Sequence, residues 1–203
     1  MNASDPVADV GVTVRDPQTL AQLGQVVSAA NGAYAVDIAT GGAPVPIAID
    51  YVKSGFWSTR AFPDLPIDRD TMGNGLPLWS TGDAPVWTPA AMGMVFTASG
   101  VTRDVADGFL NIAVRDCAGN PVPGVNVSIS PSAGSTIRYQ SSSGTPSQSL
   151  TVTDGPFAHV LAINVPAGLV TVTATLPGRG FLNQQVMVQG GDVVTLAVVR
   201  ALD

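Results

Sequence analysis

The sequence contains an internal repeat, and a repeat of this length indicates a duplicated structural unit. Val14-Arg15-Asp16 recurs as Val114-Arg115-Asp116, an offset of 100 residues. Later matches keep the same order at a larger offset: Asn31-Gly32 with Asp154-Gly155, and Gly55-Phe56 with Gly180-Phe181. The larger offset indicates an insertion in the second copy. Its main part, residues 131–149, is rich in Ser, Gly and Thr and predicts a surface loop or an added hairpin.

The repeat predicts two similar β domains joined by a linker. We expect the first domain over residues 1–78, the linker over 79–106 and the second domain over 107–203. Within the linker, Thr88-Pro89 predicts the start of a short helix, because Thr caps helices and Pro is favoured at the first helical position.

Composition and patterning predict that the chain is all-β with little helix. It has 22 Gly and 16 Pro, no glutamate, and Lys53 as its only lysine, so strong helix formers for exposed positions are nearly absent. Residues 169–175 alternate between apolar side chains and threonine, the period of a half-buried strand. Each domain has room for about seven short strands, which suggests a β-sandwich.

Three motifs in the second copy carry a family resemblance. They are Ala118-Gly119-Asn120-Pro121-Val122-Pro123-Gly124 after a strand, Thr153-Asp154-Gly155-Pro156-Phe157, and Gly180-Phe181. Together they resemble carboxypeptidase regulatory-like domains, which have a transthyretin-like (prealbumin-like) β-sandwich. The first copy matches more loosely and lacks the Pro-Val-Pro-Gly segment. The resemblance implies two tandem Ig-like or transthyretin-like sandwiches, a fold used as a spacer, a binding platform or a structural appendage.

Charge and composition exclude several classes of protein. A net charge of −6 argues against nucleic-acid binding, and the sequence lacks the apolar run of roughly 18 residues that a membrane-spanning helix needs. A single cysteine excludes a disulfide within the chain. No secretory signal is visible at the start of the sequence. Because low-charge tandem β modules are typical of bacterial envelope proteins, we expect a secreted or cell-envelope protein.

The residues that catalysis or metal binding would need are scarce, so we predict no enzyme, no cofactor and no metal site. His159 is the only histidine, and Cys117 lies in a turn without a histidine nearby in sequence. The remaining candidates are a calcium site and an isopeptide bond at Lys53, which would also use an acidic residue. The aspartates considered for calcium are Asp64, Asp68, Asp70, Asp104 and Asp107, whose spacing matches no known calcium loop.

Aromatic residues are the strongest candidates for ligand binding. Trp57, Trp79 and Trp87 are the only tryptophans, and they either form a small core or stack on sugar rings. Arg138 and Tyr139, in the insertion, are candidates for a contact surface. We therefore predict a non-catalytic structural or protein-interaction module, with a carbohydrate-binding module as the alternative.

Overall fold

The computed structural model describes residues 7–63, 66–67 and 86–202, and this part of the chain contains twelve strands and one helix. The first four strands are β1 (Gly11–Arg15), β2 (Gln22–Val27), β3 (Ala48–Val52) and β4 (Ser58–Phe62), followed by α1 (Pro89–Ser99). The later strands are β5 (Gly108–Arg115), β6 (Asn126–Ser130), β7 (Thr136–Gln140), β8 (Pro146–Ser147), β9 (His159–Val165), β10 (Gly168–Thr175), β11 (Gln184–Val188) and β12 (Val193–Arg200). The prediction of an all-β sandwich with little helix is confirmed.

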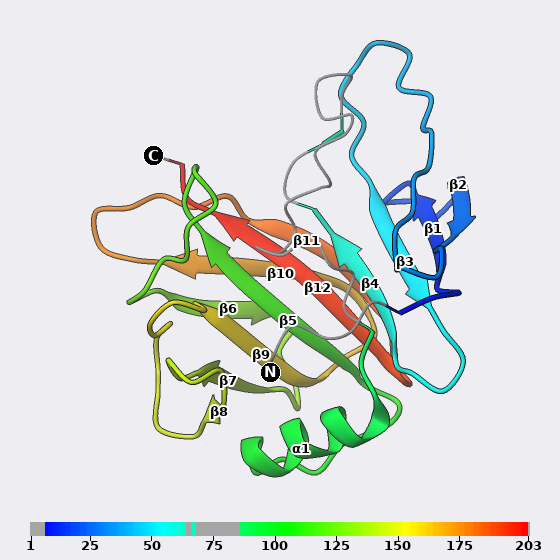
Figure 1. Cartoon of the computed structure of the whole chain (residues 1–203). Coiled ribbons are helices and arrows are strands. Elements are labelled where there is room, and N and C mark those ends of the chain that lie inside the picture. Colours follow the sequence, from blue (N-terminus) through cyan, green and yellow to red (C-terminus); the bar gives the residue numbers. More distant parts are fainter. Residues whose placement is uncertain (1–6, 64–65, 68–85, 203) are drawn as a thin grey trace.

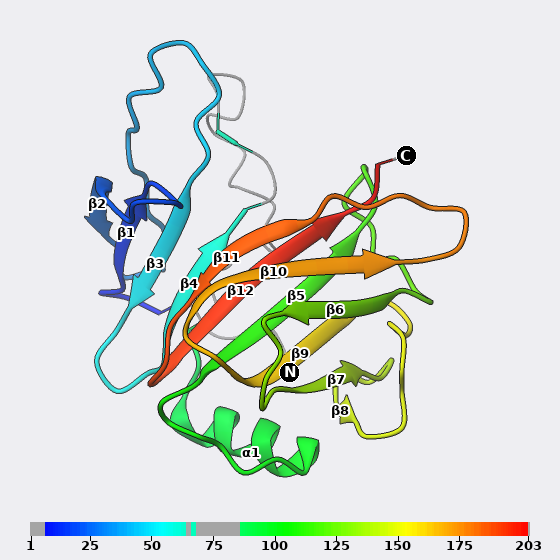
Figure 2. The same ribbon diagram turned by 180° about the vertical axis from the view of Figure 1, so that it is seen from behind.

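Nine of the strands form one large sheet, in the order β2-β1-β3-β4-β12-β5-β9-β7-β8 (Figure 1). The other three form a small sheet, in the order β11-β10-β6. Neighbouring strands are antiparallel except at β12, which is parallel to both β4 and β5. Seen from behind, the small sheet lies in front of the centre of the large one, and β1, β2 and β3 extend beyond it (Figure 2).

The large sheet has a hydrophobic core on each of its faces. Along β5, Leu110 and Ile112 face the small sheet, whereas Phe109 and Ala113 face the other side. Met92 of α1 belongs to the second core. This alternation follows from the period of a strand, and each fully buried Leu or Ile stabilises the fold by roughly 1.5–3 kcal/mol.

Helix α1 begins where the sequence predicts it. The hydroxyl of Thr88 accepts a hydrogen bond from the Ala91 amide, and Pro89 is the first helical residue. The helix ends at Gly100, whose φ of 65° is the left-handed conformation that glycine favours at this position. Among the described residues, no helix is both long enough and apolar enough to cross a membrane.

Strands from both predicted domains belong to the same sheet. β12 pairs with β4, which precedes residue 78, and with β5, which follows residue 107. The domain boundaries therefore stay a prediction, and the segment before residue 78 adds four strands to the large sheet. The insertion predicted as a loop or an added hairpin forms the antiparallel pair β7–β8 at the far edge of that sheet.

Candidate functional site

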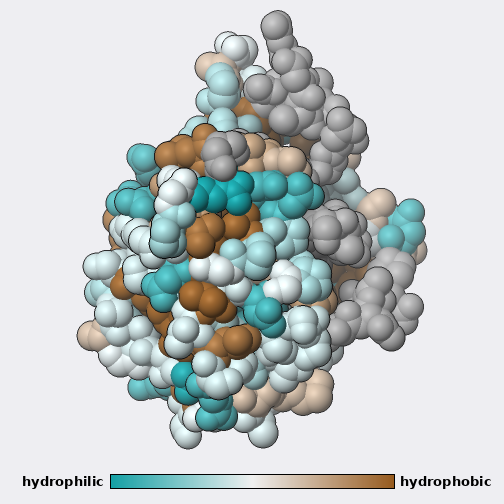
Figure 3. Space-filling view, turned by 90° about the vertical axis from the view of Figure 1, so that its left-hand side faces the viewer, coloured by the Kyte–Doolittle hydropathy of each residue, from teal (hydrophilic) through white to brown (hydrophobic). Residues whose placement is uncertain are grey.

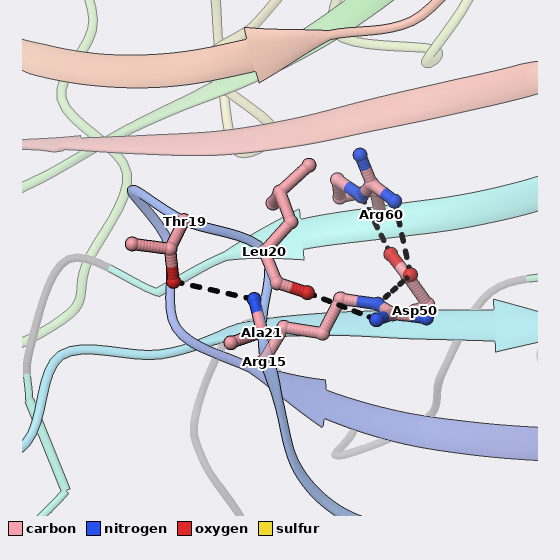
Figure 4. Close-up of polar contacts among 6 residues, drawn as sticks. All are labelled: Arg15, Thr19, Leu20, Ala21, Asp50 and Arg60. Atoms are coloured by element: carbon pink, nitrogen blue, oxygen red, sulfur yellow. Dashed lines mark hydrogen bonds and ion pairs between the residues drawn. The ribbon is translucent and has the colours of Figure 1, made fainter.

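In the first part of the chain, a buried carboxylate is held by two arginines (Figure 4). Asp50 of β3 accepts hydrogen bonds from Arg15 Nε of β1 at 2.6 Å and from Arg60 Nε of β4 at 2.6 Å. Arg60 Nη2 donates a further bond to Asp50 at 3.0 Å, so this pair is bidentate. The three residues come from neighbouring strands, because Thr13 lies opposite Asp50 and Asp50 lies opposite Arg60.

This cluster has a structural role, because it links β1, β3 and β4, and it is not suited to acid or base catalysis. Burial alone would raise the pKa of Asp50, but the hydrogen bonds and charges of Arg60 and Arg15 outweigh it and lower the pKa. The carboxylate therefore stays ionised at neutral pH. Arg15 also donates to the carbonyl of Leu20 at 2.9 Å, which holds the turn after β1 (Figure 4).

Trp57 lies in an aromatic cluster on the helix side of the large sheet. Its backbone amide donates to the Trp87 carbonyl at 2.7 Å, and its ring packs against Phe96 at a centroid distance of 5.9 Å. The guanidinium of Arg103 lies 4.2 Å from the centre of the indole, a cation–π contact. Arg103 is held there by Asp192 at 2.8 Å. Only 4% of Trp57 is exposed, so its ring has no free face for a sugar.

A shallow surface depression lies beside this cluster and encloses no space for a ligand. Arg103, Asp107 and Asn164 provide polar groups in its wall. Asn164 is already engaged, because its side chain accepts from the Asp104 amide at 2.9 Å and donates to the Thr102 carbonyl at 2.9 Å. Arg103 and Asn164 therefore use their polar groups for contacts within the chain, which leaves few of them for a ligand.

Of the other four predicted ligand-binding residues, the structure describes Trp87, Arg138 and Tyr139. Trp87 is half-buried, and Trp79 lies outside the described residues. Tyr139 is 4% exposed, and its hydroxyl accepts from the Val127 amide at 2.9 Å. Arg138 donates from Nε to the carbonyl of Ser99, at the end of α1, at 2.9 Å. Ligand binding by these residues stays a prediction, and the rings of Trp57 and Tyr139 are buried in the protein interior.

His159 has an environment that opposes its use as a catalytic base. Its Nε2 lies 3.1 Å from Arg115 Nη2, and because arginine only donates, Nε2 accepts and the ring proton lies on Nδ1. Burial, followed by the charge of Arg115, lowers the pKa of His159 to about 3. A catalytic triad needs a carboxylate to stabilise the imidazolium, whereas here a cation lies beside the ring.

The remaining candidates for chemistry are dispersed. Cys117 is exposed, and its Sγ lies 3.3 Å from the Ala201 carbonyl. Lys53 donates to the carbonyl of Ala8. In the described ranges, no group of three or more His, Cys, Asp or Glu side chains could hold a metal ion. Asp64, Asp68 and Asp70 lie outside those ranges.

The structure also reveals an open part of the large sheet that the sequence did not predict. Val27 of β2 lies opposite Gly11 of β1, which in turn lies opposite Val52 of β3, so these residues form a row on one face. Val27 is 60% exposed and Val52 is 53% exposed. We call this row, Val27–Gly11–Val52, the open-sheet row. Only the strand order reveals it, because the small sheet stops short of these strands.

Comparisons with known proteins return distant structural likenesses. No protein-family model matches the sequence, and no curated protein was found to be similar to it. Among solved structures, the Bacillus anthracis TIE protein has 12% identity and a TM-score of 0.30, with 97% of this chain aligned. The chain spans only 31% of that protein. The minor pilin GBS52 of Streptococcus agalactiae has 12% identity and a TM-score of 0.31, with 99% of this chain and 86% of that protein aligned.

Proposed function

We propose that this protein is a non-catalytic module that acts outside the cytoplasm, in the bacterial cell envelope or in secreted form, and that it has a structural role or binds a protein partner. One observation carries the proposal, the open-sheet row. The small sheet covers the centre of the large sheet and leaves the face of β1, β2 and β3 open (Figure 2).

The composition of this open face suits a protein partner. Exposed valines lie beside the mostly buried Arg15–Asp50–Arg60 cluster, of which the Arg15 side chain, 29% exposed, adds a fixed polar group to the surface, as protein interfaces do. At the end of the molecule away from β2, hydrophobic residues form separate areas between polar ones (Figure 3).

The buried ionisable groups support a non-catalytic role. Asp50 is neutralised by two arginines, and His159 is held neutral beside Arg115. Catalytic acids and bases usually have pKa values near the working pH. Both shifts described here move a group away from neutral pH, as expected of structural groups.

Site-specific photo-crosslinking tests the proposal in cells that naturally produce the protein. A benzoylphenylalanine at position 52 lies on the open face, and the same residue at position 169 is the matched control, because Leu169 is 55% exposed on β10. We expect protein adducts from position 52 and few from position 169. We also expect protease added to intact cells to digest the protein. Equal adducts at the two positions, or digestion only after lysis, would contradict the proposal.

Carbohydrate binding is the alternative, and its test uses tryptophan emission. Because Trp57 is buried, binding would have to use Trp87 or Trp79. A shift of emission on titration with polysaccharides, lost in Trp87→Ala or Trp79→Ala, would favour this alternative over a protein partner.

A further inference from the structure

The two sheets have four edge strands, and two of them are blocked by simple means. β8, at one end of the large sheet, is only two residues long and begins with Pro146, which has no amide hydrogen to donate. At β6, the Tyr139 hydroxyl accepts from the amide of Val127 and donates to its carbonyl, at 2.9 and 3.3 Å. Short strands, proline and side-chain caps all hinder the addition of another strand.

The edge strand β11 is fixed at both of its ends to the large sheet. Before the strand, the Leu182 amide donates to the Arg200 carbonyl at 3.0 Å. After the strand, Gly190 forms an isolated bridge with Gly108 of β5, and the Gly191 amide donates to the Val105 carbonyl just before β5 at 2.9 Å. An added strand would meet these crossings at each end of β11, so this edge is closed as well.

β2, at the other end of the large sheet, has none of these protections. It has six residues and contains neither proline nor a charged side chain. Val27 at its end is 60% exposed. In Figures 1 and 2, β2 lies at the outer limit of the sheet with no described strand beyond it.

The hydrogen-bond pattern shows which backbone groups of β2 point outward. The Ser28 amide donates to the Val10 carbonyl at 2.9 Å, so the backbone groups of Ser28 point toward β1. In an antiparallel pair, alternate residues face the partner strand. Val26, opposite Val12, therefore also faces β1, whereas Gln25 and Val27 present their amides and carbonyls to the outside. Within the described part of the chain, these outward groups have no backbone partner.

We propose that β2 is a dimerisation edge, at which the β2 strand of a second copy of this chain adds in antiparallel orientation. This inference rests on the proposed function, because it identifies the protein partner proposed above as a second copy of this chain. The twofold axis passes through Val26, so Gln25 lies opposite the partner's Val27. Both residues point their backbone groups outward, and the junction forms four main-chain hydrogen bonds. Two nine-stranded sheets thereby become one continuous sheet.

The strand fits a second copy because it is self-complementary in this register. A twofold interface uses the same patch on both subunits, so each residue must tolerate its symmetry mate. On one face, exposed Val27 packs on the aliphatic part of the partner's Gln25. On the other face, Val26 meets the partner's Val26, and Gly24 lies opposite the partner's Ser28. Although each chain carries a net charge of −6, β2 itself brings no charge to the junction.

Sedimentation velocity over about 1–200 μM tests the proposal on the full chain. We expect the average mass to rise with concentration from 20.7 kDa toward twice that value. Gln25→Pro removes only an outward amide, and Val27→Lys brings a positive charge to the edge. Both variants should stay monomeric at every concentration. Leu169→Lys is the matched control, because it places the same charge at an exposed strand position, 55% exposed on β10 and away from β2, and it should dimerise as the native protein does.

Far-ultraviolet circular dichroism of each variant shows that it is folded, and Val27→Lys keeps the test valid if Gln25→Pro does not fold. In a Cys117→Ser background, Val26→Cys should form an intermolecular disulfide with oxidised glutathione, since position 26 lies on the axis. A native protein that stays monomeric, a folded edge variant that still dimerises, or a dimer without this disulfide would overturn the proposal. A monomer that still gives adducts with another protein from position 52 would refute the second copy and leave the proposed function standing.

Discussion

Asp50 is the residue whose loss should affect the first strands most. Asp50→Asn removes the carboxylate and leaves Arg15 and Arg60 facing each other in a partly buried position. Breaking such a cluster on one side should lower the free energy of unfolding by about 3 kcal/mol. Urea denaturation measures this value. Asp9→Asn is the control, because the Asp9 side chain is 83% exposed and lies 3.9 Å from Lys53, so it should cost less than about 0.5 kcal/mol.

His159 should make the protein sensitive to mild acid. Its pKa is about 3 in the folded state and near 6.5 in the unfolded chain, so the unfolded chain binds the extra proton first. The stabilising effect of a neutral His159 is complete above pH 6.5 and is lost as the pH falls from 6.5 toward 3. We expect a loss of about 2 kcal/mol between pH 6.5 and pH 4.5.

The variant His159→Gln supplies the control for this pH dependence. Glutamine can still accept from Arg115 but does not titrate. Thermal unfolding at a series of pH values should therefore give a flatter profile for the variant between pH 6.5 and 4.5. Parallel profiles for the two proteins would contradict this account of His159.

At the residue scale, the repeated Val-Arg-Asp sequence ends a strand at both of its positions, but its arginines have different partners. Asp16 accepts from the Thr19 amide at 2.7 Å, and Asp116 accepts from the Asn120 amide at 2.7 Å, so each copy ends a strand with a capped turn. The preceding arginines differ, because Arg15 binds Asp50 whereas Arg115 contacts His159. Those partners lie 35 and 44 residues away, and no local pattern encodes such contacts.

Two glycines in different elements should respond to alanine in opposite directions. A Cβ at Gly190 would collide with the carbonyl oxygen of Ala106, which is backbone and cannot move without shifting the segment that leads into β5. Gly190→Ala should therefore destabilise the protein by about 3 kcal/mol. A Cβ at Gly93, in α1, would meet nothing within 4 Å. Gly93→Ala should stabilise it by about 0.5–1 kcal/mol, because alanine favours the helix. Urea denaturation of both variants, compared with the native protein, tests the two signs.

Elements with local signals were predictable, and those defined by distant pairing were not. Thr88-Pro89 predicted the start of α1, and the composition of 131–149 predicted a surface loop or an added hairpin, of which the structure has the hairpin of β7 and β8. The place of β12 between β4 and β5 had no such signal. Leu196 lies opposite both Ala61 and Asn111, and parallel pairing across such separations leaves no turn in the sequence to mark it. The open-sheet row was missed for the same reason.

For the whole molecule, the shared sheet predicts a single unfolding transition. All three tryptophans lie between residues 57 and 87, so fluorescence reports on the first part of the chain, whereas circular dichroism reports on every strand. The two signals should change at the same urea concentration. Ala197→Asp places a charge at a fully buried position of β12 and should abolish both signals together. Two separate transitions would show that the predicted domains are independent.

The direction of the strands has a mechanical consequence. β1 is antiparallel to β3, β3 is antiparallel to β4, and β4 is parallel to β12, so β1 and β12 run the same way. The start of β1 and the end of β12 therefore lie toward opposite ends of the sheet. A stretching force applied there acts along the strands and across their hydrogen bonds, which lie roughly perpendicular to it. The ladders between β1 and β12 are loaded in shear, so their bonds must break together rather than unzip one at a time.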